Sequence, residues 1–176
     1  NHALADVTYR NLQLVGAPSY GEQARRFGRD VQRNLGLDPM DDPFIADNCR
    51  LVTPQEWDAV QRRGLPPWQT NFTSDDYVDY TWPAPTVRLH TSRPRLKPPP
   101  GYAYPSWVNV AMGGVPDCIE PGMLVAGKTI AATFVDLLTR PEELRRARAE
   151  FEERTGGGVG GSRWVAPLLP ADFPPP

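Results

Sequence analysis

Histidine and cysteine, the side chains that most often hold a zinc ion, are scarce in this sequence. Its 176 residues include two histidines, His2 and His90, and two cysteines, Cys49 and Cys118. Neither cysteine has a partner at CxxC spacing or a nearby histidine, so the chain carries no zinc-finger pattern. Two cysteines are also too few for a disulfide scaffold, and we expect ordinary reduced thiols. For the histidines we expect solvent-facing or structural roles, because a metal site needs several convergent ligands.

The sequence also lacks the patterns of export, membrane insertion and nucleic-acid binding. No apolar run approaches the roughly 20 residues that a membrane span needs, and the first residues lack the basic and apolar regions of a signal peptide. A net charge of −2 gives no general attraction to nucleic acid or to an anionic membrane. We therefore expect a cytoplasmic protein with neither nucleic acid nor membrane as a partner.

Two further features concern the origin of the chain. It has no initiator methionine, and we expect that it begins inside a longer polypeptide or at a processed end. Arginine outnumbers lysine, and alanine, glycine and proline are plentiful. This composition is typical of a GC-rich bacterial genome.

Short catalytic motifs are missing as well. The sequence has no HExxH or GxSxG pattern. The glycine-rich segment Gly156–Gly161 follows a predicted helix, whereas a phosphate cradle precedes one, so we interpret it as a hinge or loop. The acid pairs Glu142-Glu143 and Glu152-Glu153 alternate with arginines, which is typical of a solvated helix face.

Helical periodicity covers much of what remains. The spacing of apolar residues predicts helices over residues 3–15, 20–35, 54–64, 123–138 and 140–155. Ser19, Thr53 and Thr139 each precede a glutamate by three residues, which is the capping-box spacing. The segment 123–138 is apolar nearly all the way round, so we expect it to be buried on most sides.

Two segments alternate between apolar and polar residues and predict strands, Thr86–His90 and Trp107–Ala111. The four prolines of Arg93–Gly101 predict a loop between them. Two strands make a poor sheet, and the apolar helix 123–138 needs a surface to pack against. The fold that we expect is therefore α/β and helix-rich, with a sheet completed by sequence outside this chain.

The densest group of functional side chains lies between residues 73 and 82. Three aspartates and three aromatic residues fall within ten positions: Asp75, Asp76, Tyr77, Asp79, Tyr80 and Trp82. Such a group can form the rim of a site, and it can equally be an acidic solvated loop. The pattern alone leaves both readings open.

Several segments together resemble one enzyme family. In chain order they are Leu4-Ala5-Asp6 to Pro18, Ser74-x-Asp76-x-x-Asp79-x-x-Trp82 with Pro85-Thr86, Ser106-Trp107 with Gly113-Gly114, Pro121 to Lys128, Ala149 to Gly157, and Pro170-Ala171-Asp172 with Pro174-Pro175. Their order and spacing are similar to the B subunits of aminobenzoyl-glutamate hydrolases. These subunits belong to the di-zinc family of aminoacylases and carboxypeptidase-G-like peptidases. The resemblance extends over nearly the whole chain and is least specific in the first 50 residues.

The resemblance implies a zinc-peptidase-like (phosphorylase/hydrolase-like) catalytic domain that is interrupted by a lid. Residues 1–165 correspond to the part after the lid, and 166–176 to a Pro-rich extended tail. The family motifs that hold most of the zinc precede the lid and have no counterpart here. The remaining half of the catalytic domain and the lid are thus the expected partners, from the same precursor or from a second chain in a hetero-oligomer.

The resemblance also selects the candidate site residues, which are Asp76, Asp79, Ser106 and Trp107. The family's metal-binding histidine before Ser-Trp is replaced by Pro105, and a second family histidine falls at about Glu120. Proline has no side-chain group that binds zinc. The chain itself is therefore expected to supply no metal ligand, and any zinc would be held mostly by residues outside it.

Two functions remain open after the sequence analysis. The chain can complete an amidohydrolase that cleaves an N-acyl or aminobenzoyl amino acid, a small-molecule amide, with an altered metal site. Alternatively, it belongs to a pseudo-enzyme subunit or a metal-independent biosynthetic enzyme on the same peptidase fold. The resemblance favours the first function, and Pro105 and Glu120 favour the second.

Overall fold

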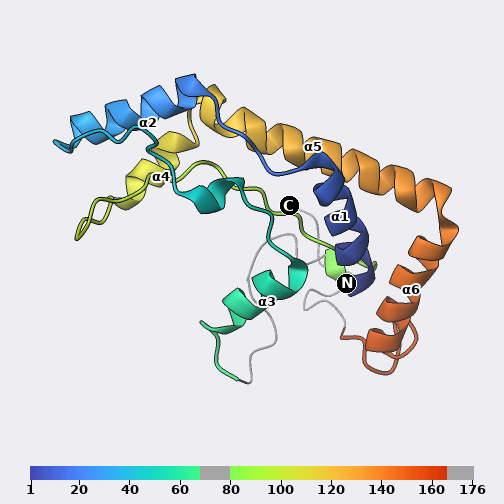
Figure 1. Ribbon diagram of the computed structural model, residues 1–176. Helices are drawn as coiled ribbons and strands as arrows, with labels where there is room; N and C mark the ends of the chain where they lie inside the picture. Colours follow the sequence, from blue (N-terminus) through green and yellow to red (C-terminus); the bar gives the residue numbers. More distant parts are fainter. Residues whose placement is uncertain (68–79, 166–176) are drawn as a thin grey trace, which may run out of the picture. The chain divides into compact units, whose positions relative to one another are not determined.

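The computed structural model describes residues 1–67 and 80–165, which form mostly helix (Figure 1). The elements in chain order are α1 (His2–Val15), α2 (Glu22–Asn34), the 3-10 turn η1 (Ala46–Cys49), α3 (Pro54–Arg62), α4 (Ser106–Met112), α5 (Pro116–Thr139) and α6 (Pro141–Thr155). The helix-rich character predicted from the sequence is confirmed. Within these two described ranges no residue belongs to a strand, and a single antiparallel bridge joins Phe44 to Leu96.

The chain divides into two compact units. The described residues of unit 1 fall within Asn1–Tyr9, Val52–Arg88 and Thr133–Pro176. Those of unit 2 fall within Arg10–Leu51 and Leu89–Ala132. Each unit is built from segments that lie far apart in the sequence, so neither could be recognised from local patterns.

Several helix ends follow the signals in the sequence. The Thr53 hydroxyl accepts a hydrogen bond from the Glu56 amide at 3.1 Å and caps α3, with Pro54 in the first turn. The residue after α6 is Gly156, whose φ of 71° is left-handed and suits a residue without Cβ. The predicted helix ends at these positions are confirmed.

Two of the predicted capping boxes are wrong. The cap residue of α2 is Gly21, without a side-chain hydrogen bond, so Ser19 does not cap this helix. Thr139 is the last residue of α5, and its hydroxyl donates to the Val135 carbonyl at 2.7 Å. One residue, Arg140, then separates α5 from α6. A threonine that ends one helix is not available to cap the next.

The predicted strand Trp107–Ala111 is also wrong, because these residues lie inside α4. Val108 and Met112 are both fully buried, and their separation of four residues is the helical repeat. Residues 86–90, the other predicted strand, carry no strand pairing. Alternation over five residues does not distinguish a strand from a short helix when one helical face is buried.

Unit 2 contains the larger core. Its buried residues are Tyr20, Ala24, Val31, Phe44, Leu96, Val108, Met112 and Cys118. Gln32 is also completely buried, and both ends of its amide are bonded: Nε2 donates to the Tyr104 hydroxyl at 3.1 Å, and Oε1 accepts from the Met40 amide at 2.9 Å. A buried amide that is satisfied in this way fixes the geometry of its neighbours.

Unit 1 has a smaller core in which α1 meets α6. Ala3, Leu4 and Ala147 are buried together, and Val87 and Leu137 pack against them. The Glu150 carboxylate accepts hydrogen bonds from the amides of His2 and Ala3, both at 2.8 Å. A side chain from α6 therefore satisfies amides at the start of α1, which the helix cannot satisfy itself.

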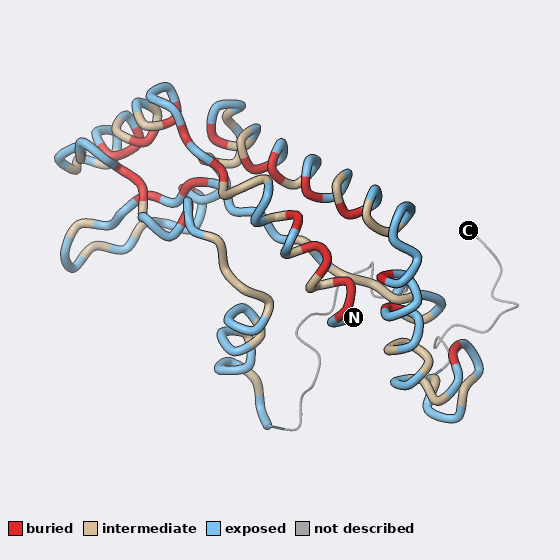
Figure 2. The backbone as a smooth tube through the Cα atoms, turned by 45° about the vertical axis from the view of Figure 1, so that its right-hand side comes forward, coloured by how far each residue is buried: buried red, intermediate tan, exposed pale blue. Residues whose placement is uncertain are grey.

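The two faces of α5 differ sharply. Buried positions recur about once per turn along the helix (Figure 2): Cys118, Gly122, Val125, Thr129 and Thr133. The exposed residues of 123–138 are apolar except for Lys128, and we call the apolar ones the α5 stripe: Met123, Leu124, Gly127, Ile130, Ala131, Phe134, Val135 and Leu138. The expectation that this segment is buried on most sides is therefore wrong for the described chain.

The length of α5 also differs from the prediction. The helix begins at Pro116 rather than Met123 and includes Pro121 in its second turn. By length and composition alone, the resulting 24-residue helix is long and apolar enough to cross a membrane, contrary to the expectation that no segment approaches that length. A core helix of a soluble protein meets the same criterion.

Candidate functional site

The residues selected by the resemblance are only partly within the described structure. Asp76 and Asp79 lie outside the described residues. Ser106 and Trp107 open α4, and both are exposed. Two of the four candidates, which are adjacent in the sequence, thus lie in the first turn of one short helix.

Pro105, which the predicted resemblance aligns with a metal-binding histidine of the family, is the residue just before α4. Its φ of −54° and ψ of 145° direct the chain into the helix. Its carbonyl oxygen accepts a hydrogen bond from the Val108 amide at 3.0 Å. The position thus serves to start a helix, and its side chain offers no atom to a metal.

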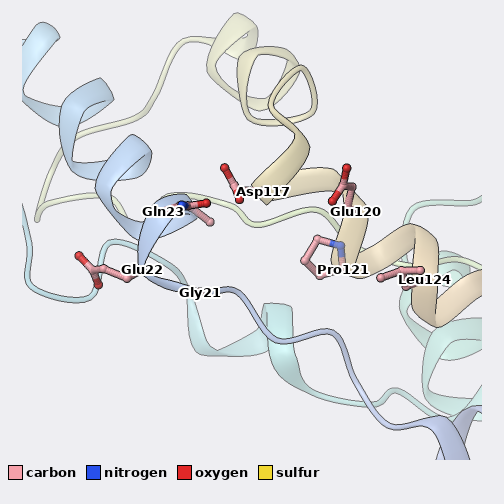
Figure 3. Close-up of a pocket in the computed structure, with 8 residues that line it drawn as sticks. Gly21, Glu22, Gln23, Asp117, Glu120, Pro121 and Leu124 are labelled. Carbon is pink, nitrogen blue, oxygen red and sulfur yellow. The ribbon is translucent and has the colours of Figure 1, made fainter.

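Glu120, which the predicted resemblance aligns with a second family histidine, lines a pocket of about 300 Å³ in unit 2. We call it the acidic pocket. One wall is the start of α2 and the other is the start of α5 (Figure 3). The lining residues are Gly21, Glu22, Gln23, Ala24, Asp117, Glu120, Pro121 and Leu124.

The carboxylates of the acidic pocket do not converge on one point. Glu22 forms an ion pair with Arg29, and its carboxylate points away from those of Asp117 and Glu120 (Figure 3). Glu22 and Asp117 each lie in the first turn of a helix, where a negative charge favours the helix dipole. Their contribution to helix stability explains the positions of these two carboxylates, and no bound ligand is needed to account for them.

Metal-ligating side chains are dispersed in the part of the chain that the structure describes. No three histidine, cysteine, aspartate or glutamate residues there are grouped so that they could hold a metal ion. His2 and His90 are both exposed. The described residues therefore do not by themselves fit the zinc site that the resemblance implies.

The two cysteines have different surroundings. Cys49 is exposed, whereas Cys118 lies in the core of unit 2. Burial raises the pKa of the Cys118 thiol to about 11, and the nearby Asp117 acts in the same direction. A thiol with such a pKa is a poor nucleophile at neutral pH, so Cys118 is a packing residue.

A second pocket, of about 400 Å³, was missed by the sequence analysis. We call it the arginine pocket, and its lining residues are Thr91, Ser92, Arg93, Arg95, Asn109 and Ile119. The segment 93–101 was predicted only as a loop because of its prolines. The alternation Arg93-Pro94-Arg95-Leu96, with the two arginines exposed and the other two residues buried, was the available signal.

Comparison with protein-family models, with characterised proteins and with solved structures finds no match to this chain. The resemblance described above rests on the quoted motifs alone and stays a prediction.

Proposed function

We propose that this chain is the post-lid part of the catalytic domain of an amidohydrolase-like enzyme, whose substrate is an N-acyl or aminobenzoyl amino acid. The observation that carries the proposal is the ordered series of motifs from Leu4 to Pro175. Each motif is short and weak by itself. Their common order and spacing over nearly the whole chain favour descent from one enzyme family over coincidence.

The α5 stripe supports the proposal that the chain is one part of a larger domain. Six large apolar side chains of α5 are between 45 and 80% exposed. Covering them would contribute on the order of 10 kcal/mol, at about 2 kcal/mol for each side chain. This is comparable with the whole stability of a domain, so we expect that the native protein covers the stripe.

The occupant that we propose for the α5 stripe is the β-sheet of the same domain, supplied by sequence outside this chain. An α/β domain packs its helices on a sheet, and the described residues contribute no strand of their own. The small residues Gly127 and Ala131 lie in the middle of the stripe. They leave room for a flat surface to approach the helix closely.

The chemistry in this proposal belongs mostly to the other half of the domain. That half would supply the carboxylate general base and hold the metal that activates water. The described residues of this chain do not fit a zinc site, so we assign them no step that proceeds through a metal. Their proposed contribution is to complete the domain and one wall of the substrate site, with Ser106 and Trp107 as the exposed candidates.

A second function is favoured by the two substituted positions. Pro105 has no ligand atom, and Glu120 carries a carboxylate where the family has an imidazole. These two changes support an enzyme that has been redirected to metal-independent biosynthesis on the same fold, or a pseudo-enzyme subunit. A cytoplasmic location is part of both proposals.

The test is an activity assay on the complete protein that contains this chain. Aminobenzoyl-glutamate and a set of N-acetyl amino acids are incubated with it, and the released amine is quantified by chromatography before and after chelator treatment. Release that is lost with the chelator and restored by zinc supports the amidohydrolase. Absence of release from every substrate, in a protein that is folded and complete, contradicts the amidohydrolase and favours the second function.

A further inference from the structure

The arginine pocket has the composition of an anion-binding site. Two arginines, two hydroxyl residues, one asparagine and one isoleucine surround about 400 Å³ of space in unit 2. No carboxylate is among the lining residues. The volume lies within the range of small-molecule sites, which run from about 300 to 1,000 Å³.

The backbone holds both arginine side chains on the same side of an extended segment. The Ile45 amide donates to the Arg95 carbonyl at 3.0 Å, and the Lys97 amide donates to the Pro43 carbonyl at 2.7 Å. Between the arginines, Pro94 is fully buried, and Leu96 after them is buried as well. In an extended chain alternate side chains share one side, so Arg93 and Arg95 project together from Cα atoms about 7 Å apart.

The segment is tied down further by side-chain hydrogen bonds. The Asn48 amide donates to the Arg95 carbonyl at 3.2 Å, and the Ser92 hydroxyl donates to the Asn48 carbonyl at 3.1 Å. Asn48 is itself buried. The backbone that carries the two arginines is thus held in place by these hydrogen bonds. A binding site requires such a rigid support for its side chains.

Gly113, just after α4, makes room for Arg93. A Cβ atom added to Gly113 would lie 2.6 Å from Nη1 of Arg93 and 3.2 Å from its Cδ. The φ of Gly113 is −79°, which any residue adopts, so the backbone does not require glycine there. A side chain at this position would therefore displace the guanidinium that lies over it.

The donors of the two guanidinium groups are unused within the described part of the chain. Most other arginines pair with a carboxylate: Arg25, Arg29, Arg33, Arg50, Arg62, Arg140, Arg146, Arg148 and Arg154. Arg93 and Arg95 have no such partner among residues 1–67 and 80–165, although each guanidinium carries five N–H donors. Both groups are positively charged and line the same pocket, so an anion bound there would reduce their mutual repulsion.

We propose that the arginine pocket binds a small dicarboxylate, with one carboxylate on Arg93 and the other on Arg95. A planar carboxylate matches the paired N–H groups of a guanidinium. A dicarboxylate offers one carboxylate to each arginine, and the Asn109 amide in the same lining offers a further donor. This site does not depend on the proposed amidohydrolase function, because it rests on the geometry of unit 2 alone.

The experiment measures how fast each arginine of the full chain reacts with phenylglyoxal. Peptide mass spectrometry identifies the arginines that have been modified. Glutarate, inorganic phosphate and sodium chloride are compared at equal ionic strength. Two charge-assisted contacts support a Kd of about 1 mM, so glutarate at about ten times this concentration should slow the modification of Arg93 and Arg95 about tenfold. Arg26 and Arg145, both exposed, serve as internal controls and should react at an unchanged rate.

Two glycine variants distinguish binding at a preorganised site from non-specific attraction of anions to positive charge. Gly113→Ala should displace the Arg93 guanidinium and abolish its protection, because the side chain can swing away without disturbing the fold. Gly114→Ala is the matched control, since a Cβ there meets only the Ala111 carbonyl oxygen at 3.4 Å. Equal protection of all four arginines, or no protection by glutarate, would overturn the proposal. Protection by phosphate with none by glutarate would overturn the dicarboxylate assignment.

Discussion

At the scale of single residues, Pro105 tests the proposal that this chain has lost a metal ligand of the family that it resembles. Its φ of −54° suits any residue, and the side chain is exposed, so Pro105→His should fold. If the neighbouring metal ligands of the family are present in the other half of the domain, the new imidazole should raise the zinc content of the complete protein by roughly one ion per chain. Elemental analysis of the native and variant proteins measures this difference.

The matched control for this variant is Pro116→His. Pro116 is also an exposed proline next to the start of a helix, but no family ligand corresponds to it. The Pro116→His variant should leave the metal content of the complete protein unchanged. Two tightly held metals in the native protein would contradict the loss of a ligand, and no metal in any of the three proteins would favour metal-independent chemistry.

Glu150 links pH to stability in unit 1. Burial alone would raise the pKa of its carboxyl, but the hydrogen bonds from the His2 and Ala3 amides, with Arg154 nearby, outweigh burial and lower the pKa. A lowered pKa means that the carboxylate stabilises the folded chain at neutral pH. This contribution is lost as the pH falls below the ordinary value of 4.5 and through the lowered pKa.

Glu150→Gln should therefore lower the free energy of unfolding by about 1 kcal/mol at neutral pH, the usual value for a lost helix cap. At a pH below the lowered pKa the difference between variant and native chain should disappear. Urea unfolding at both pH values gives the two differences. Glu152→Gln, on the same helix and paired only with exposed Arg148, should cost under about 0.5 kcal/mol, and an equal loss from both variants would refute the capping role.

At the scale of elements, Gly28 shows how α2 is packed in unit 2. A Cβ at this position would meet Leu96, Phe44 and Pro43, each at 3.0 Å. Alanine normally stabilises a helix by about 1 kcal/mol relative to glycine, but overpacking on three core side chains costs about 1–3 kcal/mol. We expect Gly28→Ala to lower the stability of the chain by about 1 kcal/mol, measured as the urea midpoint followed by circular dichroism.

Gly127 in α5 is the matched control, because a Cβ there has nothing within 4 Å. In the isolated chain Gly127→Ala should raise stability by up to about 1 kcal/mol. In the complete protein this gain should shrink or reverse, since we propose that a sheet covers this position. A gain from Gly28→Ala in the isolated chain would contradict the tight packing of α2.

The elements that the sequence predicts well are those fixed by local chemistry. The cap at Thr53 and the glycine after α6 depend on residues within one turn, and both are found where predicted. The interpretation of Trp107–Ala111 as a strand failed because the burial of Val108 and Met112 is decided by distant segments of unit 2. The predicted start of α5 at Met123 was wrong, because the helix begins at Pro116 and retains Pro121 and Gly122.

For the candidate sites, too, the sequence predicts local features but not the contacts between distant segments. Pro105 and Glu120 were selected by motif position, which stays a prediction, and their surroundings could not be predicted. The arginine pocket combines residues from 91–95 with Asn109 of α4 and Ile119 of α5. No spacing rule connects these segments, because the bonds between 43–45 and 95–97 create the extended geometry.

At the scale of the whole molecule, the uncovered α5 stripe is the feature that the described chain does not explain. Contiguous apolar patches of this kind are uncommon on independent soluble proteins and mark surfaces that contact another partner. The central proposal is that this partner is the sheet of a larger catalytic domain. The isolated chain should then behave as a protein with an unsatisfied interface.

Sedimentation velocity of the purified chain tests this proposal most directly. We expect the native chain to self-associate as its concentration rises and to bind a hydrophobic dye. The triple variant Leu124→Lys, Phe134→Lys and Leu138→Lys places charges along the stripe, and lysine keeps a helix stable. It should be monomeric and bind little dye, with an unchanged helical spectrum. A native chain that remains monomeric and binds no dye would contradict the proposal, because the stripe would then be stable in water without a partner.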